Sequence, residues 1–242
     1  MKICIAQIKP FKGDIERNIE NHIRLVDIAV SNGAGVIVFP ELSLTSYEPK
    51  LSKELATNQY DKRLDRFQTI SDTKHITIGI GLPTISNFGV LISMIIFQPN
   101  KARQTYSKQH LHSDEFPYFV NGQHQVILTI DNKKIAPAIC YESLLPEHSE
   151  KVFKKGADVY IASVAKSANG VIKAFKHYPE MAKQYSMTVL MSNCVGQCDD
   201  FESAGKSSIW NKKGLLLGQL NGTNEGILIV DTETEEIIEW TE

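Results

Sequence analysis

The chain has 242 residues, of which 42 % are hydrophobic and 22 % are charged. This length and composition fit one globular domain of the larger α/β or sandwich kind, so we expect a single domain over residues 1–242 with a sizeable buried core. The formal net charge is −2 and no run of basic residues occurs. The sequence therefore lacks the positive surface that binding to nucleic acid requires.

The N-terminal residues and the cysteines indicate a cellular compartment. The sequence begins with a strand-like alternation and lacks the basic leader, apolar core and cleavage site of a signal peptide. No apolar segment approaches the roughly 20 residues that cross a bilayer. We therefore expect a soluble cytoplasmic protein without a membrane partner. Free thiols in a reducing compartment are expected at Cys4, Cys140, Cys194 and Cys198.

The first half of the chain predicts alternating strands and helices, followed by strands joined by tight turns. After a strand over residues 2–9, Asp14 is expected to cap a helix. The apolar run 35–39 predicts a buried strand that ends before Pro40 and Glu41. The later predicted elements are a helix over residues 59–73 and strands over 75–85, 90–98 and 102–107, the last leading to Lys108.

In the second half, a strand predicted over residues 134–139 leads to Cys140, and Pro146 suits the first turn of a helix that ends near Gly156. Strand–helix units mixed with hairpins predict a layered α/β fold whose mixed sheets are covered by helices. The other predicted elements are strands over 125–130, 157–162 and 188–193, a helix over 171–186, and hairpins over 206–230 with turns at 211–214 and at Asn221-Gly222.

Three of the predicted strands end directly before a reactive side chain. These groups are the carboxylate of Glu41, the amine of Lys108 and the thiol of Cys140. Ligands of layered α/β proteins bind outside the carboxyl ends of strands. We therefore expect the three groups to surround one cavity.

The stretches around these residues resemble the motifs of the carbon–nitrogen hydrolase (nitrilase) superfamily, in its amidase-like branch. They occur in the family's order and read Val-Phe-Pro-Glu-Leu over 38–42, Tyr-Ser-Lys-Gln-His-Leu over 106–111 and Ile-Cys-Tyr-Glu-Ser-Leu-Leu-Pro-Glu over 139–147. Residues 156–159 and 192–196 also resemble family stretches. The resemblance implies a four-layer αββα sandwich of two mixed β-sheets, a homodimer or larger assembly, and no metal or organic cofactor.

The resemblance also implies hydrolysis of a non-peptide carbon–nitrogen bond through a cysteine thioester. A free thiol has a pKa of about 8.5, so Cys140 needs a nearby cation or base before it attacks at neutral pH. Glu41 is expected to be the general base, and Lys108 to hold the tetrahedral oxyanion. The backbone N–H of Tyr141, directly after the nucleophile, is the expected second oxyanion donor.

Further site residues follow from the resemblance. The family carries a second carboxylate shortly after the lysine, and Glu115 matches that position best, with the adjacent Asp114 as the competing assignment. Glu142 occupies an acidic position that follows the family cysteine by two residues, where a structural or a substrate-binding role is open. Lys166 and Lys173 are candidate cations of the substrate pocket and would favour an acidic substrate.

The expected substrate is a small linear amide that releases ammonia, such as an ω-amide of a dicarboxylic acid or an N-carbamoyl compound. Nitrile hydrolysis is less common in the family. Two stretches that would line the pocket depart from the family's usual pattern. Residues 193–196 read Asn-Cys-Val-Gly where many relatives have Asn-Arg-Val-Gly, and residues 162–166 differ from the usual Pro-Ser stretches. These departures leave the substrate open.

Three other interpretations compete with the amidase. His110 and His112 suggest a Cys–His protease, in which the glutamate and lysine motifs would have no role. Cys194 and Cys198 have Cys-x-x-x-Cys spacing, which suggests metal binding or a redox pair, but no second pair has the spacing of a zinc site. The third is a non-catalytic small-molecule-binding or regulatory module, which has no chemical need of all three reactive side chains.

Overall fold

The computed structural model describes residues 1–242 and contains two large mixed β-sheets. The strands of the first sheet are β1 (Lys2–Gln7), β2 (Val36–Val38), β3 (Thr77–Ser86), β4 (Gly89–Phe97), β5 (Gln104–Ser107), β14 (Gly226–Asp231) and β15 (Ile237–Thr241). They lie in the order β15-β14-β1-β2-β3-β4-β5. Strand β2 pairs in parallel with β1 and β3, and the other neighbours are antiparallel.

The second sheet combines parallel strands at its centre with antiparallel strands at its edges. Its strands are β6 (Leu128–Ile130), β7 (Lys133–Ile139), β8 (Val159–Val164), β9 (Thr188–Asn193), β12 (Ser208–Trp210) and β13 (Leu216–Gln219). They lie in the order β13-β12-β9-β8-β7-β6, with β8 parallel to β7 and β9. A separate small hairpin consists of β10 (Val195–Cys198) and β11 (Phe201–Ala204).

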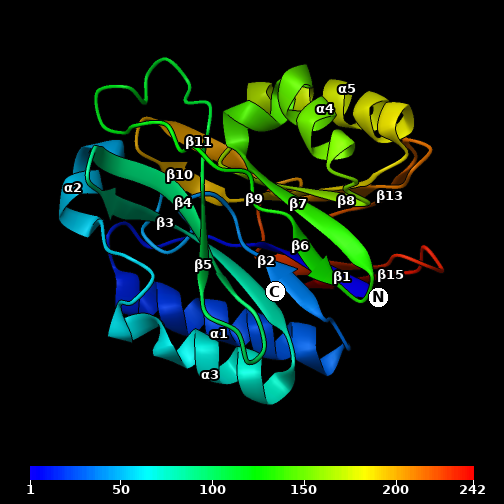
Figure 1. Ribbon diagram of the computed structural model, residues 1–242, viewed down its shortest axis with the longest axis horizontal. Helices are drawn as coiled ribbons and strands as arrows, with labels where there is room; N and C mark the ends of the chain where they lie inside the picture. The colour runs from blue at the N-terminus through cyan, green and yellow to red at the C-terminus, as the bar shows by residue number, and fades with distance from the viewer.

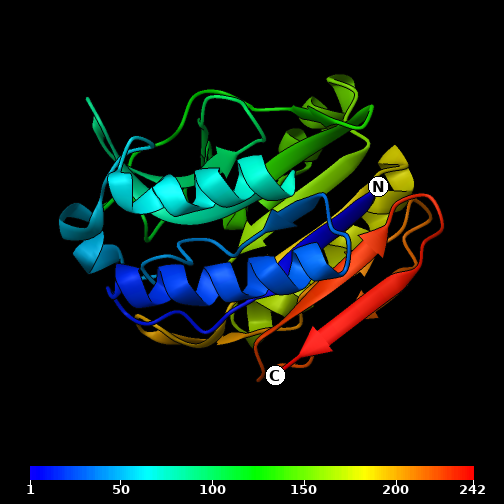
Figure 2. The same ribbon diagram turned by 90° about the horizontal axis from the view of Figure 1, so that it is seen from below.

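Helices cover the outer face of each sheet and complete four layers (Figure 1). Helices α1 (Ile15–Ser31) and α3 (Asp65–Lys74) lie side by side on the first sheet, as Figure 2 shows, whereas α4 (Pro146–Lys154) and α5 (Ala168–Tyr185) cover the second. The predicted αββα sandwich is confirmed. Short helices occur at η1 (Pro49–Leu51), α2 (Ser52–Leu55), η2 (Lys62–Leu64) and η3 (Cys140–Leu144). None of the helices has the length and apolar character to cross a bilayer.

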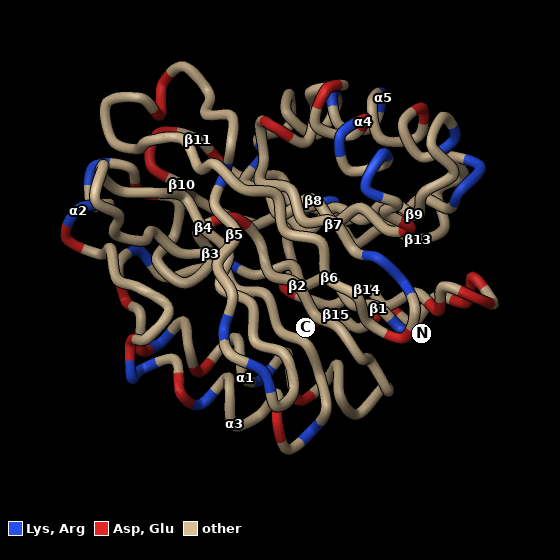
Figure 3. Tube along the Cα trace, in the orientation of Figure 1, with Lys and Arg blue, Asp and Glu red and all other residues tan.

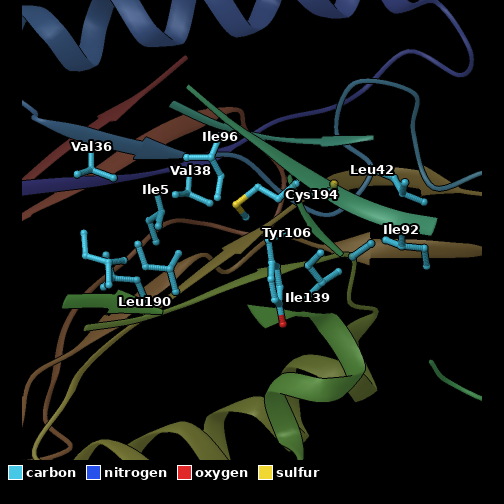
Figure 4. Packing of buried hydrophobic residues seen from close by; sticks show 14 of the residues in the cluster. Ile5, Val36, Val38, Leu42, Ile92, Ile96, Tyr106, Ile139, Leu190 and Cys194 are labelled. Atoms are coloured by element: carbon cyan, nitrogen blue, oxygen red, sulfur yellow. The ribbon is translucent and has the colours of Figure 1, made fainter. Parts of the chain in front are cut away.

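Three apolar clusters fill the spaces between the four layers. The largest lies between the sheets, where Ile5 and Val38 of the first sheet face Ile139 and Leu190 of the second (Figure 4). Because both faces of each sheet are covered, their central strands read as nearly continuous apolar runs. Charged residues of both signs lie mainly on the outer helices and loops (Figure 3).

Polar contacts also connect the two sheets near the carboxyl end of β2. The Ser192 hydroxyl of β9 donates to the carbonyls of Ala6, at 2.6 Å, and Val38, at 3.1 Å. The Ser163 hydroxyl of β8 donates to the Phe39 carbonyl at 2.8 Å. These bonds run from hydroxyl groups of the second sheet to backbone acceptors of the first sheet and of Phe39, which follows β2. They tie the segment that leads to Glu41 to the opposite sheet.

Most of the predicted elements are confirmed, including the helix capped by Asp14, whose side chain accepts from the Arg17 N–H at 3.1 Å. The turn at 211–214 joins antiparallel β12 and β13, as predicted. The predicted hairpin at Asn221-Gly222 is wrong, because this turn leads from β13 in the second sheet to β14 in the first. The hairpin of β10 and β11 and the strand β15 were not predicted.

Candidate active site

The three reactive side chains meet at the carboxyl ends of strands from both sheets, as predicted. Glu41 follows β2 by three residues, Lys108 follows β5 directly, and Cys140 follows β7 directly and begins η3. The Lys108 N–H donates to the Ile92 carbonyl at 2.9 Å, which continues the pairing of β5 with β4 up to the lysine. Two sheets packed face to face thus hold the site between them.

Lys108 is fully buried between two carboxylates. Its Nζ lies 2.8 Å from Glu41 Oε1 and 2.6 Å from Glu115 Oε1. The Tyr47 hydroxyl donates to Glu115 Oε1 at 3.0 Å, and the His112 N–H donates to Glu115 Oε2 at 2.7 Å. Burial disfavours the charge on Lys108, but Glu41 and Glu115 outweigh this effect and raise its pKa. The ammonium is therefore held charged and fixed in position.

Cys140 sits at a sharp strand-to-helix turn. Its φ of +47° is a left-handed conformation that is costly for a side chain with a Cβ, and such strain accumulates at functional sites. Its Sγ lies 3.8 Å from both the Ala165 carbonyl oxygen and Lys166 Nζ. The turn therefore directs the thiol away from the sheet and toward the residues that follow β8.

Glu41 is placed to accept the thiol proton. Burial raises the pKa of this carboxyl group, whereas the charge of Lys108 lowers it. Its Oε1 accepts from Lys108, while Oε2 is buried and has no hydrogen-bond partner. Burial also raises the pKa of the Cys140 thiol to about 11, so the thiol is protonated at neutral pH and needs a base.

Of the two adjacent carboxylates considered for the second acidic position, Glu115 is the one that contacts Lys108. Asp114 is exposed and instead accepts from the His112 ring at 2.5 Å. Its carboxylate makes no contact with the lysine. The geometry thus favours Glu115 and places Asp114 at the rim.

The thiol opens onto a cleft of about 290 Å³, close to the lower limit of about 300 Å³ for ligand pockets. Such a volume suits a small substrate. Tyr141 and Lys166, which are expected to bind substrate, line this cleft, and so does the exposed Lys173. The other lining residues are Tyr47, Lys108, His112, Asp114, Glu115, Cys140, Leu144, Ala165, Ser167, Gly170 and Phe201.

Glu142 does not line the cleft, so the geometry gives it a structural role rather than contact with substrate. One oxygen accepts from the Tyr106 hydroxyl at 2.5 Å and the Ile139 N–H at 2.8 Å. The other accepts from the N–H groups of Gln109, at 2.6 Å, and His110, at 3.2 Å. These backbone donors flank Cys140 and Lys108 in sequence, so one buried carboxylate connects the two segments.

The alternative sites are not supported by the geometry. The His112 ring packs against Tyr141 and contacts Asp114 rather than the thiol, which argues against a Cys–His pair. Cys194 and Cys198 are buried in the apolar cluster between the sheets. Tyr47, Gly170 and Phe201 line the cleft and were missed from the sequence. They lie in a loop, in α5 and in β11, and no local pattern marks residues that reach a site through tertiary packing.

A family model described as carbon–nitrogen hydrolase matches residues 2–242. The chain belongs to the carbon–nitrogen hydrolase family. Its family and fold are those of amidase- and nitrilase-type enzymes. The 2-oxoglutaramate amidase of Bacillus subtilis is 28 % identical over 88 % of this chain and 83 % of its own length.

Other relatives are longer than this chain. Glutamine-dependent NAD(+) synthetases of Aquifex aeolicus and Thermotoga maritima are 24 % and 26 % identical over 98 % of it. The carbon–nitrogen hydrolase chain spans less than half of their length, 43 % and 42 % respectively.

Solved structures with the same fold include the NitN amidase from Nesterenkonia sp. AN1. It has a TM-score of 0.88 and 22 % identity, covering 96 % of this chain and 92 % of that one. A mutant of the Nesterenkonia amidase carries the acetamide moiety of fluoroacetamide covalently added at its active site cysteine. Its structure has a TM-score of 0.87 and 21 % identity, covering 96 % of this chain and 89 % of that one. At this identity the likeness establishes the fold.

Proposed function

We propose that this carbon–nitrogen hydrolase is an amidase that cleaves a small linear amide through a thioester at Cys140 and releases ammonia. The observation that carries the proposal is a buried lysine held by two buried carboxylates beside a thiol that faces a small cleft. A structural ion pair does not require the adjacent strained cysteine. The cysteine adduct of the Nesterenkonia amidase supports the same chemistry.

In the acylation step, Glu41 takes the thiol proton and Cys140 Sγ forms a bond to the amide carbon. The carbonyl electron pair moves to oxygen, and the resulting oxyanion is stabilised by Lys108 and by the Tyr141 N–H. When the carbon–nitrogen bond breaks, Glu41 returns the proton to the departing nitrogen as ammonia leaves. The product is an acyl thioester on Cys140.

In the deacylation step, the now ionised Glu41 removes a proton from water, and the hydroxyl attacks the thioester. The carbon–sulfur bond breaks, the acid product leaves, and Glu41 returns the proton to Cys140. Glu115 holds Lys108 through both steps, because it accepts from the same ammonium. The cycle uses only groups of this chain, the amide and water.

The substrate class we propose is an ω-amide that carries a carboxylate, with N-carbamoyl compounds as the second class to test. Lys166 lies beside the thiol and Lys173 lies at the rim, so the cleft presents two cations to an acidic group. Two relatives are named for ω-amides, 2-oxoglutaramate and glutamine. The small cleft supports a short acyl chain.

The proposal is tested by ammonia release from a panel of ω-amides, N-carbamoyl compounds, uncharged amides and nitriles. We expect release with at least one short amide, an acyl adduct on Cys140 by intact mass, and loss of both in Cys140→Ala. Cys198→Ala is the matched control, because it removes a buried thiol that does not line the cleft. No release and no adduct across the panel would favour the non-catalytic binding module.

A further inference from the structure

Lys166 is a buried lysine without a carboxylate partner. The residue is 4 % exposed, no acidic oxygen lies within 4.0 Å of its Nζ, and the hydrogen-bonding contact of that atom is with Cys140 Sγ. A buried ammonium without a counter-charge is costly. The position of Lys166 therefore calls for a negative charge at the place where the thiol sits.

The backbone of Lys166 is fixed by several hydrogen bonds. Its N–H donates to Asn193 Oδ1 at 2.8 Å. Its carbonyl accepts from Asn193 Nδ2 at 3.1 Å, the Ser203 hydroxyl at 3.2 Å and the Ala204 N–H at 2.9 Å. Its aliphatic stem packs over Gly170, where an added Cβ would lie 3.1 Å from Lys166 Cβ. The chain therefore directs this side chain to the sulfur with little freedom.

The charges around the thiol indicate that Lys108 alone does not stabilise the thiolate of Cys140. Glu41, Glu115 and Lys108 together carry one net negative charge, which opposes ionisation of the adjacent sulfur. Lys108 is already shared by both carboxylates. Lys166 is the cation beside Cys140 whose charge is not engaged by an acidic group, and an opposite charge at such a distance favours a thiolate.

Groups from every neighbouring element act on the thiol. Burial raises the pKa of Cys140 most, and Glu41 raises it further. Of the two lysines that lower this pKa, Lys166 has the larger effect and Lys108 the smaller one. The ionisable residues that face Cys140 or line its cleft are Glu41, Tyr47, Lys108, His112, Asp114, Glu115, Tyr141, Lys166, Lys173 and Tyr178.

We propose that Lys166 is a second catalytic lysine, which stabilises the thiolate of Cys140 while Lys108 serves the oxyanion. This inference rests on the proposed role of Cys140 as nucleophile. The proton moves from Sγ to the Glu41 carboxylate, and the sulfur that remains carries a negative charge paired with the Lys166 ammonium. Once the thioester forms the sulfur is neutral, and the ammonium is free to face the acidic group of a substrate.

The test measures alkylation of Cys140 against pH in the full chain, with iodoacetamide as a neutral probe and iodoacetate as an anionic one. In Lys166→Met we expect the midpoint for iodoacetamide to rise by at least about one pH unit, and the rate at neutral pH to fall about tenfold. Lys166→Arg should keep most of the wild-type profile. Lys176→Met is the matched control, because it removes an exposed lysine of α5 outside the cleft.

Two outcomes would overturn the inference. One is an iodoacetamide profile in Lys166→Met that superimposes on the wild type. The other is a rate loss confined to iodoacetate, which would make Lys166 a binder of anionic groups only. If Lys166→Met does not fold, the thiolate absorbance of Lys166→Gln is measured against pH, and the signal of Cys140→Ser is subtracted as background. A titration curve like that of the wild type would then contradict the inference. Alkylation needs no amide substrate, so failure of the proposed function appears separately, as absent ammonia release.

Discussion

Lys108 depends on both of its carboxylates for different reasons. In the proposed reaction Glu41 must become free to carry a proton, whereas Glu115 is also held by Tyr47 and by the His112 N–H and carries no proton in any step. The lysine therefore keeps a negative partner while Glu41 is protonated. These two different roles explain why one lysine contacts two carboxylates.

Replacing Glu115 should therefore weaken catalysis without changing the acid that takes the thiol proton. In Glu115→Gln we expect kcat to fall about 100-fold, because a preorganised oxyanion donor loses its anchor. Asp114→Asn is the matched comparison and should lose far less, since Asp114 contacts only the exposed His112 ring. Steady-state rates of ammonia release decide between them, and equal losses would contradict the assignment.

The acid limb of the pH–rate profile should report Glu41. Because burial raises its pKa, the carboxylate becomes protonated, and unable to act as a base, at a pH above the ordinary carboxyl value of about 4.3. We expect kcat/KM for an uncharged amide to fall as the pH drops through this raised value. Because a proton passes between Glu41 and Cys140, the apparent pKa of this acid limb describes the two residues together. A kcat/KM that stays constant down to pH 4 would contradict the role of Glu41.

At the scale of elements, β3 sets the position of the Glu41 backbone. A Cβ on Gly81 would lie 2.4 Å from the Pro40 carbonyl oxygen and 2.5 Å from the Leu42 nitrogen. Gly81→Ala must therefore displace the segment that carries Glu41, the proposed general base, at a cost of about 1–3 kcal/mol for overpacking. We expect lower urea stability together with a reduced kcat.

Gly79 on the same strand provides the control for Gly81. A Cβ there would meet the flexible Met94 side chain, with its sulfur at 2.9 Å, rather than backbone atoms. Gly79→Ala should therefore alter stability while it leaves kcat largely unchanged. If the two alanine variants lose kcat equally, the close approach of Gly81 to Glu41 does not control the site.

The sequence predicted those features that local patterns encode. Apolar runs that end directly before Glu41, Lys108 and Cys140 identify strand ends, and strand ends meet at one edge of a layered fold. The Asn221-Gly222 turn was recognised, but a dipeptide carries no information on which sheet receives the next strand. The contact of Lys166 with the thiol likewise depends on how β8 lies beside β7.

At the scale of the whole molecule, buried histidines couple stability to pH. The His22 ring lies between the first sheet and its helices, contacts the Asn18 carbonyl and the Ser43 hydroxyl, and burial lowers its pKa to about 4. The unfolded chain takes up this proton near pH 6.5, whereas the folded chain does so only near pH 4. His22 therefore supports the fold fully above pH 6.5 and loses this contribution as the pH falls.

Between pH 6.5 and 4, the lowered pKa of His22 should remove about 3 kcal/mol from the free energy of unfolding. Burial lowers the pKa of His148 to about 3, which adds to the same trend. The free energy of unfolding, measured with urea at each pH, should depend less steeply on pH in His22→Asn than in the wild type. The difference in slope should correspond to nearly one proton. An unchanged slope would show that His22 titrates in the folded protein as it does in the unfolded chain.

The place of β1 in its sheet has a consequence for how the chain is made. β1 ends at Gln7, but its antiparallel partner β14 begins only at Gly226, so β1 is synthesised long before β14. During translation one edge of this apolar strand stays unpaired, and such an edge is a template for pairing with other nascent chains. Ribosome-bound chains that stop before β14 should therefore be inactive and should recruit chaperones.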